Sequence, residues 1–392
     1  MATARTYLDH NATTPMRSEA RAAMLTALER CGAPSSIHGD GRAMRKLVET
    51  ARHDVAALVG APARNVVFCS SATEANNLAL CLDWQRGRAA PLGRAAVSAV
   101  EHASVLSGGR IPADRLALLP VDARGMVDLA GASALLERWR AEGIAGLVSV
   151  MLANNETGVL QPVAALAERV HAAGGILHCD AAQAAGKIPL DIRDLGVDLI
   201  TISSHKLGGP LGAGALVMAS EALHLPNPLL RGGGQERGWR AGTENVPAIA
   251  GFGAAAAAAA RDLTADAERC RALLAVLEEG VRAIAPEAVI FGEGAPRLPN
   301  TLCFAEPGIA AETALIALDL EGISVSSGSA CSSGKVKVSH VLTAMGVPPD
   351  LAACALRVSL GRETLAEEVE FFVAVWTRLR KSLHDRKQHR AA

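Results

Sequence analysis

Small and hydroxyl-bearing residues follow an apolar run at residues 70–74. This segment includes Ala72 and Thr73 and precedes a helix that we expect to begin near Ala75. Backbone N–H groups at the start of a helix bind anions such as phosphate, because the helix dipole adds positive potential there. The segment therefore predicts a phosphate site, although an ordinary helix cap formed by Ser71 or Thr73 would use the same residues.

A carboxylate, Asp180, stands at the end of the apolar run 176–179. At the end of a buried strand it stays charged only if a cation or hydrogen bonds compensate its burial, and a protonated ring nitrogen would serve. Helix capping by Asp180 is the alternative. A metal cluster with His178 and Cys179 is disfavoured, because successive side chains of a strand point to opposite faces.

Lys206 lies in the segment 203–210, between an apolar strand and a Gly/Pro turn. Partial desolvation at such a strand end lowers the pKa of a lysine and favours the neutral amine that forms a Schiff base. A surface lysine in a turn is the simpler alternative. A phosphate cradle, an acid for a ring nitrogen and a Schiff-base lysine are the three supports that pyridoxal phosphate requires, so their combination favours a site for this cofactor.

Cys331 is the one cysteine of eight that lies in a Ser/Gly-rich stretch, residues 326–334. Such a stretch buries little surface, so we expect a mobile thiol there, and Lys335 and Lys337 would favour its thiolate. The other seven, Cys31 included, have apolar or helical contexts typical of small core residues. No two cysteines form a CxxC pair, so we expect no metal site.

Longer motifs are distributed along almost the whole chain, from residue 7 to residue 362. They are residues 7–9 with 11–15, 154–158, 232–238 with 240–243, and 326–334. Together with Asp180 and the Ser203-x-His205-Lys206 string, they resemble the motifs of NifS/IscS-type cysteine desulfurases, which are fold-type I pyridoxal-phosphate enzymes of the class V aminotransferase family. One departure is Ala33, where this family commonly has Asn.

The resemblance implies a role for each site residue. Lys206 would hold pyridoxal 5'-phosphate through a Schiff base, and Asp180 would pair with its ring nitrogen. His102 would stack on the ring and move protons, while Arg357 and Asn155 would hold the substrate carboxylate. The further cofactor contacts that it implies are Ala72, Thr73, Ser203 and His205 at the phosphate, Gln183 and Asn155 near the ring oxygen, and Thr243 from the second subunit of a homodimer that shares its active sites.

The resemblance also implies the reaction. L-Cysteine would be converted to L-alanine, its sulfur would form a persulfide on Cys331, and a sulfur acceptor such as an Fe–S assembly scaffold protein would receive it. The nearest alternative is another fold-type I enzyme, an aminotransferase or a selenocysteine lyase, and Cys331 argues against an aminotransferase. A non-catalytic assembly subunit is the second alternative, but it would need neither Lys206 nor His102.

Strands that alternate with helices must position these residues. We expect strands at 66–69, 95–100, 147–152, 176–179, 199–203, 213–218, 301–305, 323–326 and 356–360, and helices at 40–60, 129–140, 163–173, 246–260 and 262–284. This alternation predicts an α/β fold with a mainly parallel sheet covered on both faces. With the resemblance, we expect a fold-type I transferase with a large domain of a seven-stranded type at 15–260 and a smaller α+β domain at 1–14 and 261–392.

The composition excludes several classes of protein. Of 392 residues, 50% are hydrophobic and the net charge is −1, which excludes a disordered chain and disfavours nucleic acids or acidic membranes as direct partners. The N-terminus lacks the apolar region of a signal peptide, so we expect a cytoplasmic protein. The apolar run 246–260 is too short to span a bilayer.

Overall fold

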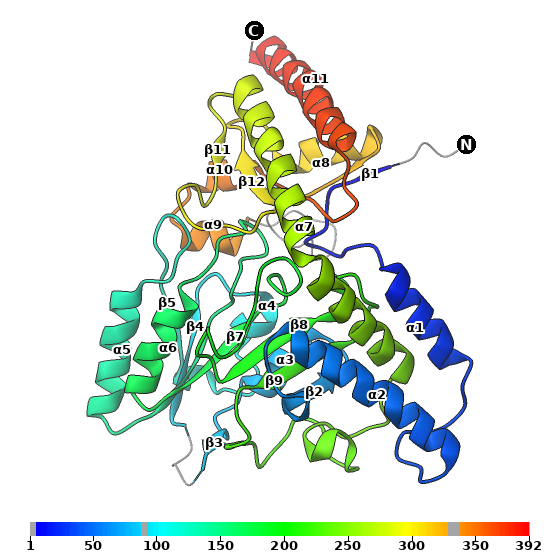
Figure 1. The fold of residues 1–392 in the computed structure, drawn as a ribbon. Coiled ribbons are helices and arrows are strands. Elements are labelled where there is room, and N and C mark those ends of the chain that lie inside the picture. The colour runs from blue at the N-terminus through cyan, green and yellow to red at the C-terminus, as the bar shows by residue number, and fades with distance from the viewer. Residues whose placement is uncertain (1–4, 88–91, 328–337, 392) are drawn as a thin grey trace.

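The computed structural model describes residues 5–87, 92–327 and 338–391. A seven-stranded sheet with the order β2-β9-β8-β7-β6-β4-β5 lies at its centre (Figure 1). Strands β4, β5, β6, β7 and β8 run parallel to one another, and β9 is antiparallel to both β2 and β8. The strands are β2 (Val66–Cys69), β4 (Arg94–Ser98), β5 (Leu116–Leu119), β6 (Gly146–Ser149), β7 (Ile176–Asp180), β8 (Leu199–Ser203) and β9 (Gly214–Met218).

Helices cover both faces of this sheet because successive side chains of each strand point to opposite sides. In β2, Val66 and Phe68 join the core on one face, whereas Val67 and Cys69 join the core on the other. The helices that contribute to the first core are α1 (Ser18–Leu28), α2 (Gly39–Leu58), α5 (Leu129–Ala141), α6 (Val163–Ala172) and α7 (Val246–Ile284), and those of the second are α3 (Ala72–Ala79) and α4 (Ala103–Leu106). The sheet is thus buried on both faces, as predicted.

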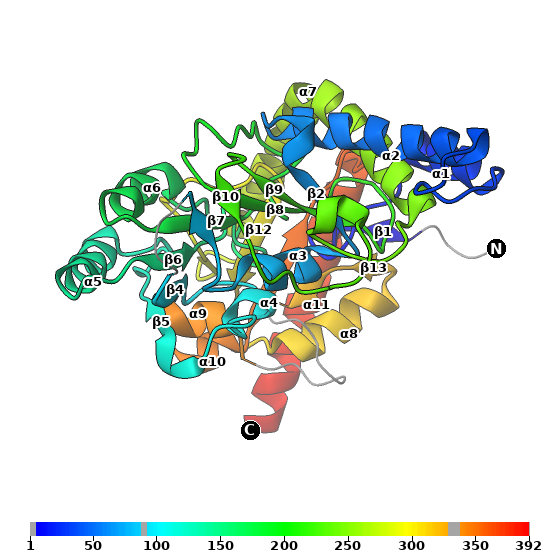
Figure 2. The same cartoon turned by 90° about the horizontal axis from the view of Figure 1, so that it is seen from below.

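Helix α7 replaces two expected helices with one of 39 residues. The expected break near residue 261 is absent because Arg261 and Asp262 continue the helix with neither Gly nor Pro between the two halves. The first half packs between α1 and α2, where a Cβ on Gly253 would lie only 2.4 Å from the Cα of Ala51. The second half of α7 leads to a smaller sheet. Helix α11 (Ala366–Ala391) packs against α7 there (Figures 1 and 2).

The smaller sheet is antiparallel, with the order β11-β12-β15-β14. Its strands are β11 (Val289–Ile290), β12 (Thr301–Ala305), β15 (Ala355–Ser359) and β14 (Ser326–Ser327), and β1 (Thr6–Tyr7) pairs separately with β13 (Ile323–Ser324). The single strand expected at 323–326 is therefore wrong, since β13 and β14 join different sheets. The nearby helices are α8 (Ala311–Leu320), α9 (His340–Ala344) and α10 (Pro349–Ala352).

The described core is divided between the two sheets. Leu8, Leu277, Phe304 and Trp376 belong to a buried cluster beside the smaller sheet, separate from the clusters of the larger one. The division into domains at 15–260 and at 1–14 with 261–392 stays a prediction.

None of the described helices has the length and hydropathy that crossing a bilayer requires. The remaining short elements are β3 (Gln85–Arg86), β10 (Leu223–His224) and the one-turn helices η1 (Ala63–Asn65), η2 (Ala113–Arg115), η3 (Ser204–Lys206) and η4 (Gln235–Gly238).

Candidate active site

The predicted site residues gather at one edge of the larger sheet. His102, Asn155, Asp180 and Lys206 follow or end β4, β6, β7 and β8, which are parallel neighbours. The carboxyl ends of such strands meet at the same edge, where α/β sheets bind ligands. Charges of Asp180 and Lys206 both act on His102, so the structure brings these three residues together.

Lys206 is the cation at the centre of the site. Its Nζ donates hydrogen bonds to the backbone carbonyl oxygens of Asn11 and of Ala12, the latter at 2.8 Å. Burial lowers the pKa of Lys206 to about 8 and Arg357 adds to the shift, while Asp9 and Asp180 oppose it. An amine with this pKa is partly neutral near physiological pH, which is the form that attacks a carbonyl group.

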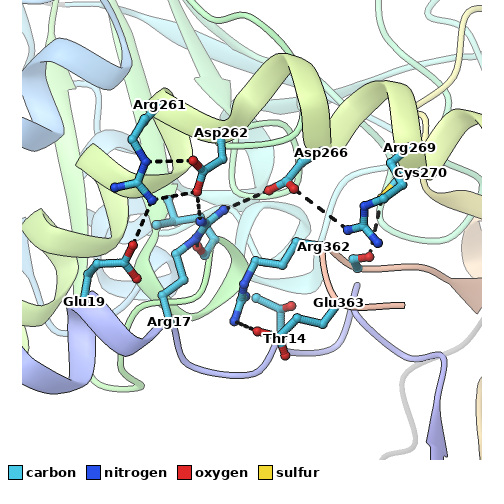
Figure 3. A network of polar contacts seen from close by, with 12 residues as sticks. Thr14, Arg17, Glu19, Arg261, Asp262, Asp266, Arg269, Cys270, Arg362 and Glu363 are labelled. Atoms are coloured by element: carbon cyan, nitrogen blue, oxygen red, sulfur yellow. Dashed lines mark hydrogen bonds and ion pairs between the residues drawn. The ribbon is translucent and has the colours of Figure 1, made fainter. Parts of the chain in front are cut away.

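An ion-pair network holds the chain segment that faces Lys206 (Figure 3). The buried guanidinium of Arg17 donates to Asp262 at 2.8 Å and to Asp266 at 3.2 Å, both on α7. Its Nε donates to the carbonyl oxygen of Leu207 at 3.2 Å. Because Arg17 ties both the N-terminal segment and the residue after Lys206 to α7, it fixes the backbone around the reactive amine.

Asp180 is buried at the end of β7. Its Oδ2 accepts a hydrogen bond from Asn76 Nδ2 at 2.7 Å, and its Oδ1 accepts one from the backbone N–H of Ala182 at 2.9 Å. Both carboxyl oxygens of Asp180 thus accept a hydrogen bond from an N–H group. Asp180 is therefore suited to face a cationic ring nitrogen, and this role stays a prediction.

The segment predicted to bind phosphate includes the first turn of α3. This helix begins at Ala72 rather than near Ala75, because Ser71 caps it: the Ser71 hydroxyl accepts a hydrogen bond from Glu74 N–H at 3.1 Å. The cap and the cradle, which were alternatives in the sequence, are compatible here. The cap uses the N–H of Glu74 and leaves the N–H groups of Ala72 and Thr73 at the helix start.

Ser203 and His205 are the other residues predicted at the phosphate. Ser203 is buried at the end of β8, and His205 Nδ1 lies 3.1 Å from the hydroxyl of Thr13. Burial, with Lys206 and Lys187, lowers the pKa of His205 to about 4, so its imidazole is neutral. A neutral imidazole can still donate one N–H to a phosphate oxygen.

Strand β9 approaches the start of α3 closely. A Cβ on Gly214 would lie 2.5 Å from the carbonyl carbon of Ser71 and 2.7 Å from the backbone nitrogen of Ala72, so only glycine fits there. Helix N–H groups for a phosphate, a carboxylate for a ring nitrogen and an amine for an aldehyde form the donor set that pyridoxal phosphate needs. The residues present therefore fit this cofactor.

Arg357 faces the site from β15 of the smaller sheet. Its Nη2 donates to Asp9 Oδ1 at 2.7 Å and its Nη1 donates to the carbonyl oxygen of Asn155 at 2.9 Å. Its buried Nε has no hydrogen-bond partner among the described residues. A buried unpaired N–H is costly, so Arg357 has a donor available for an anionic ligand.

Gln183 is held on both sides of its amide. Its Nε2 donates to the carbonyl oxygen of Asn11 and its Oε1 accepts from Lys187 Nζ, each at 2.8 Å. Lys187 Nζ also donates to Asn11 Oδ1 at 2.8 Å. Asn11 therefore joins Gln183 and Lys206, two of the predicted site residues, although no role was predicted for it.

Thr243 lies in the segment between η4 and α7, far in sequence from the other predicted site residues. Within the described chain, no hydrogen bond or ion pair links it to them, and it lines a cavity with Arg240 and with Ser70, the first residue of the predicted phosphate segment. Its loop contains Glu236 in the left-handed region, at φ 47°. The buried carboxylate of Glu236 accepts hydrogen bonds of 2.6 and 2.8 Å from Arg52, which hold the loop in this strained form.

The burial of the described cysteines differs from the expectation at one position, Cys31. Cys331 lies outside the described residues. Cys31 is exposed, so its predicted place in the core is wrong: it follows α1 in a loop that leaves it at the surface. The other described cysteines are buried, as predicted. Cys303 and Cys69, for example, have thiol pKa values raised above their usual range by burial, which makes them poor nucleophiles.

Glu156 is a buried carboxyl group beside the site, in the turn that also contains Asn155. The hydroxyl of Ser339, the residue that precedes α9, donates a hydrogen bond to its Oε2. Burial raises the pKa of Glu156 to about 7, although Ser339 and Arg357 oppose the shift. The folded protein therefore binds a proton here that the unfolded chain releases at lower pH.

This difference predicts that Glu156→Gln weakens the pH dependence of stability. With a pKa of 4.5 when unfolded and about 7 when folded, Glu156 makes the free energy of unfolding fall as the pH rises between these values. The loss is about 3 kcal/mol at most. Urea unfolding at both ends of this range should show a smaller fall for Glu156→Gln than for the wild type or for exposed Glu168→Gln. An equal fall in the free energy of unfolding in all three proteins would contradict the raised pKa of Glu156.

Several residues of the site escaped the sequence analysis. Asp9 and Asn11 belong to a motif quoted for the resemblance, which was the available signal, but their partners lie far away in the chain. Asn76 and Ser104, which connect Asp180 to His102, had no signal because both fit ordinary helix positions.

Comparison with known proteins identifies the family. The family model described as "Aminotransferase class-V" matches residues 6–372. The chain belongs to the aminotransferase class-V family. Within it, the chain is 42% identical to a cysteine desulfurase of Cereibacter sphaeroides over 95% of this chain and 94% of that protein. It is 38% identical to the cysteine desulfurase IscS of Dictyoglomus turgidum, over 96% of this chain and 95% of the relative.

Solved structures of this kind have the same fold. The NifS-like protein of Rickettsia africae superposes with a TM-score of 0.86 at 34% identity and covers 97% of this chain and 99% of its own. The apo cysteine desulfurase of Thermococcus onnurineus gives a TM-score of 0.81 at 25% identity, over 96% of this chain and 95% of the other. The predicted fold class of this class-V family member is thus confirmed.

Proposed function

We propose that this chain is a pyridoxal-phosphate-dependent cysteine desulfurase, which converts L-cysteine to L-alanine and leaves the sulfur as a persulfide on Cys331. The observation that carries the proposal is the arrangement of Lys206, Asp180 and Arg357 around one site, with an amine of lowered pKa, a hydrogen-bonded carboxylate and a guanidinium with an unused donor. The relatives named as cysteine desulfurases support it.

The chain's own residues would hold the cofactor and the substrate. Pyridoxal phosphate, when bound, supplies an electron sink that stabilises negative charge at the substrate Cα. Lys206 would bind its aldehyde carbon covalently and Asp180 its ring nitrogen. The residues proposed at its phosphate are Ala72, Thr73, Ser203 and His205, and those near its ring oxygen are Gln183 and Asn155.

Arg357 would bind the substrate carboxylate. Asp9 and the carbonyl oxygen of Asn155 fix the two terminal nitrogens of its guanidinium, so its orientation is set before substrate arrives. A preorganised guanidinium loses less conformational entropy on binding than a free one. Lys206 and His102 would donate and accept protons at the substrate carbons.

Cys331 would accept the sulfur. Its thiolate attacks the substrate sulfur, an S–S bond forms, the Cβ–S bond breaks, and the electron pair left on carbon takes up a proton to give alanine. The described residues on either side of its segment contact the site: Ser326 pairs with Arg357 in the sheet, and His340 Nε2 lies 2.9 Å from the carbonyl oxygen of Glu101. These contacts support delivery of Cys331 to the substrate.

A homodimer and an acceptor protein complete the proposal. Thr243, which has no described contact with its own site, would reach the phosphate of the partner's cofactor, and the Arg52–Glu236 pair would hold its loop for that purpose. The persulfide would pass to a sulfur acceptor such as an Fe–S assembly scaffold. A cytoplasmic location stays a prediction.

Product analysis separates this function from its nearest alternative. Purified protein loaded with pyridoxal phosphate should convert L-cysteine to equal amounts of alanine and sulfide in the presence of a thiol reductant. An aminotransferase would instead convert the amino acid to a 2-oxo acid only when a 2-oxo acid acceptor is added. A 2-oxo acid without alanine would overturn the proposal.

Arg357→Lys is expected to raise the KM for L-cysteine by about ten- to a hundredfold, because lysine keeps the charge beside Asp9 but loses the guanidinium donors. Steady-state alanine formation at varied L-cysteine measures the effect. Arg378→Lys, at an exposed ion pair with Glu321, is the matched control and should leave KM unchanged. An unchanged KM in Arg357→Lys would remove Arg357 from the carboxylate site.

A further inference from the structure

A chain of hydrogen bonds connects two predicted site residues through two that have no assigned role. Asn76 Nδ2 lies 2.7 Å from Asp180 Oδ2 and 2.9 Å from Ser104 Oγ. Ser104 Oγ lies 2.8 Å from His102 Nδ1. Asn76, Ser104 and Asp180 are all buried, whereas His102 is open to solvent on one side. The chain thus runs through the protein from the carboxylate to the imidazole.

The chemistry at its two ends sets the direction of every bond. An ionised carboxylate only accepts, so Asn76 turns its amide nitrogen toward Asp180 and uses its second N–H on Ser104 Oγ. The Ser104 hydroxyl proton then has His102 Nδ1 as its acceptor. The backbone N–H of Ser104 also donates to this Nδ1, at 3.1 Å. With both donors aimed at Nδ1, the neutral ring carries its proton on Nε2.

We propose that Asn76 and Ser104 are positioning residues that hold His102 in its Nε2–H tautomer and fix its ring relative to Asp180. The inference rests on the proposed function, in which His102 moves protons beside the cofactor. Because Nδ1 is occupied, Nε2 is the ring nitrogen that exchanges protons with the substrate. A histidine that moves protons must have its tautomer defined by the partner of its other nitrogen.

The surroundings of His102 favour the same neutral form. Partial burial lowers the pKa of His102, the charges of Lys206 and His340 add to this, and Asp180 opposes it. A proton on Nδ1 would end the hydrogen bond from the backbone N–H of Ser104, and the Ser104 hydroxyl would have to turn its own proton away from the ring. The hydroxyl of Ser104 therefore makes the imidazolium less favourable, and its removal should make the ring more basic.

Nuclear magnetic resonance of the full-length protein with isotope-labelled histidine tests the proposal. It measures the tautomer and the pKa of His102, with and without bound cofactor. His102→Gln identifies the His102 signals among those of 11 histidines. We expect an unprotonated Nδ1 in the neutral ring and, in Ser104→Ala, a pKa of His102 raised by about half a unit to one unit. Ser104→Thr keeps the hydroxyl and should restore the wild-type pKa. Ser107→Ala, at the other end of α4, is the matched control and should change nothing.

Two results would overturn the proposal: a neutral His102 ring protonated on Nδ1 in the wild type, or an unchanged tautomer and pKa in Ser104→Ala. If Ser104→Ala fails to fold, Asn76→Ala decides in its place, because it releases the Ser104 hydroxyl and should raise the pKa in the same direction. The resonance experiment needs no turnover. Absence of alanine formation would therefore overturn the proposed function and leave the positioning of His102 standing.

Discussion

Lys206→Ala lowers the rate of alanine formation from L-cysteine by roughly a thousandfold or more, since it removes the amine that both binds the cofactor and moves protons. The purified variant also loses the visible absorbance of covalently bound cofactor. Lys206→Arg gives the same loss, although it keeps the positive charge, because a guanidinium does not deprotonate in proteins. The lowered pKa of Lys206 is the structural reason for this distinction.

The control for these variants is Lys46→Ala, an exposed lysine on α2. It should retain both the absorbance and the rate of the wild type. Near-normal turnover in Lys206→Arg would show that charge alone is needed at this position. Near-normal turnover in Lys206→Ala would exclude Lys206 as the residue that binds the cofactor.

Cys331→Ser has the second large expected effect, a fall in alanine formation of about a hundredfold or more, because a serine hydroxyl is a poor nucleophile toward sulfur at neutral pH. Substrate binding should survive, so L-cysteine should still change the absorbance of the bound cofactor. Cys31→Ser, which replaces the described exposed cysteine, is the matched control and should keep full activity. Full alanine formation in Cys331→Ser would exclude Cys331 as the sulfur acceptor.

Six of the seven strands of the larger sheet were predicted, because each contains a short apolar run; β5 (Leu116–Leu119) was not predicted. Strands β2 and β8 have the predicted bounds, and β7 extends by one residue to include Asp180. Parallel strands buried on both faces give this clear signal. The positions of Asp180 and Lys206 at strand ends followed directly from it.

Contacts between distant segments were not predictable in this way. Asp9 forms an ion pair with Arg357, 348 residues away in the sequence, and Asn11 accepts a hydrogen bond from Lys187, 176 residues away. Local sequence patterns carry no information about contacts at such separations. The exposure of Cys31 has the same origin, since only the packing of the loop after α1 decides it. Asn76 and Ser104 could not be singled out because asparagine and serine are common in helices for reasons unrelated to a site.

The central claim is that sulfur from L-cysteine is transferred to Cys331. The most direct measurement is mass spectrometry of the protein after reaction with L-cysteine without reductant or acceptor, combined with alanine analysis. The account predicts one added sulfur atom on the peptide that contains Cys331 and an equal amount of alanine. Alanine formed without sulfur on Cys331, or sulfur found on another cysteine while Cys331 stays unmodified, would contradict it.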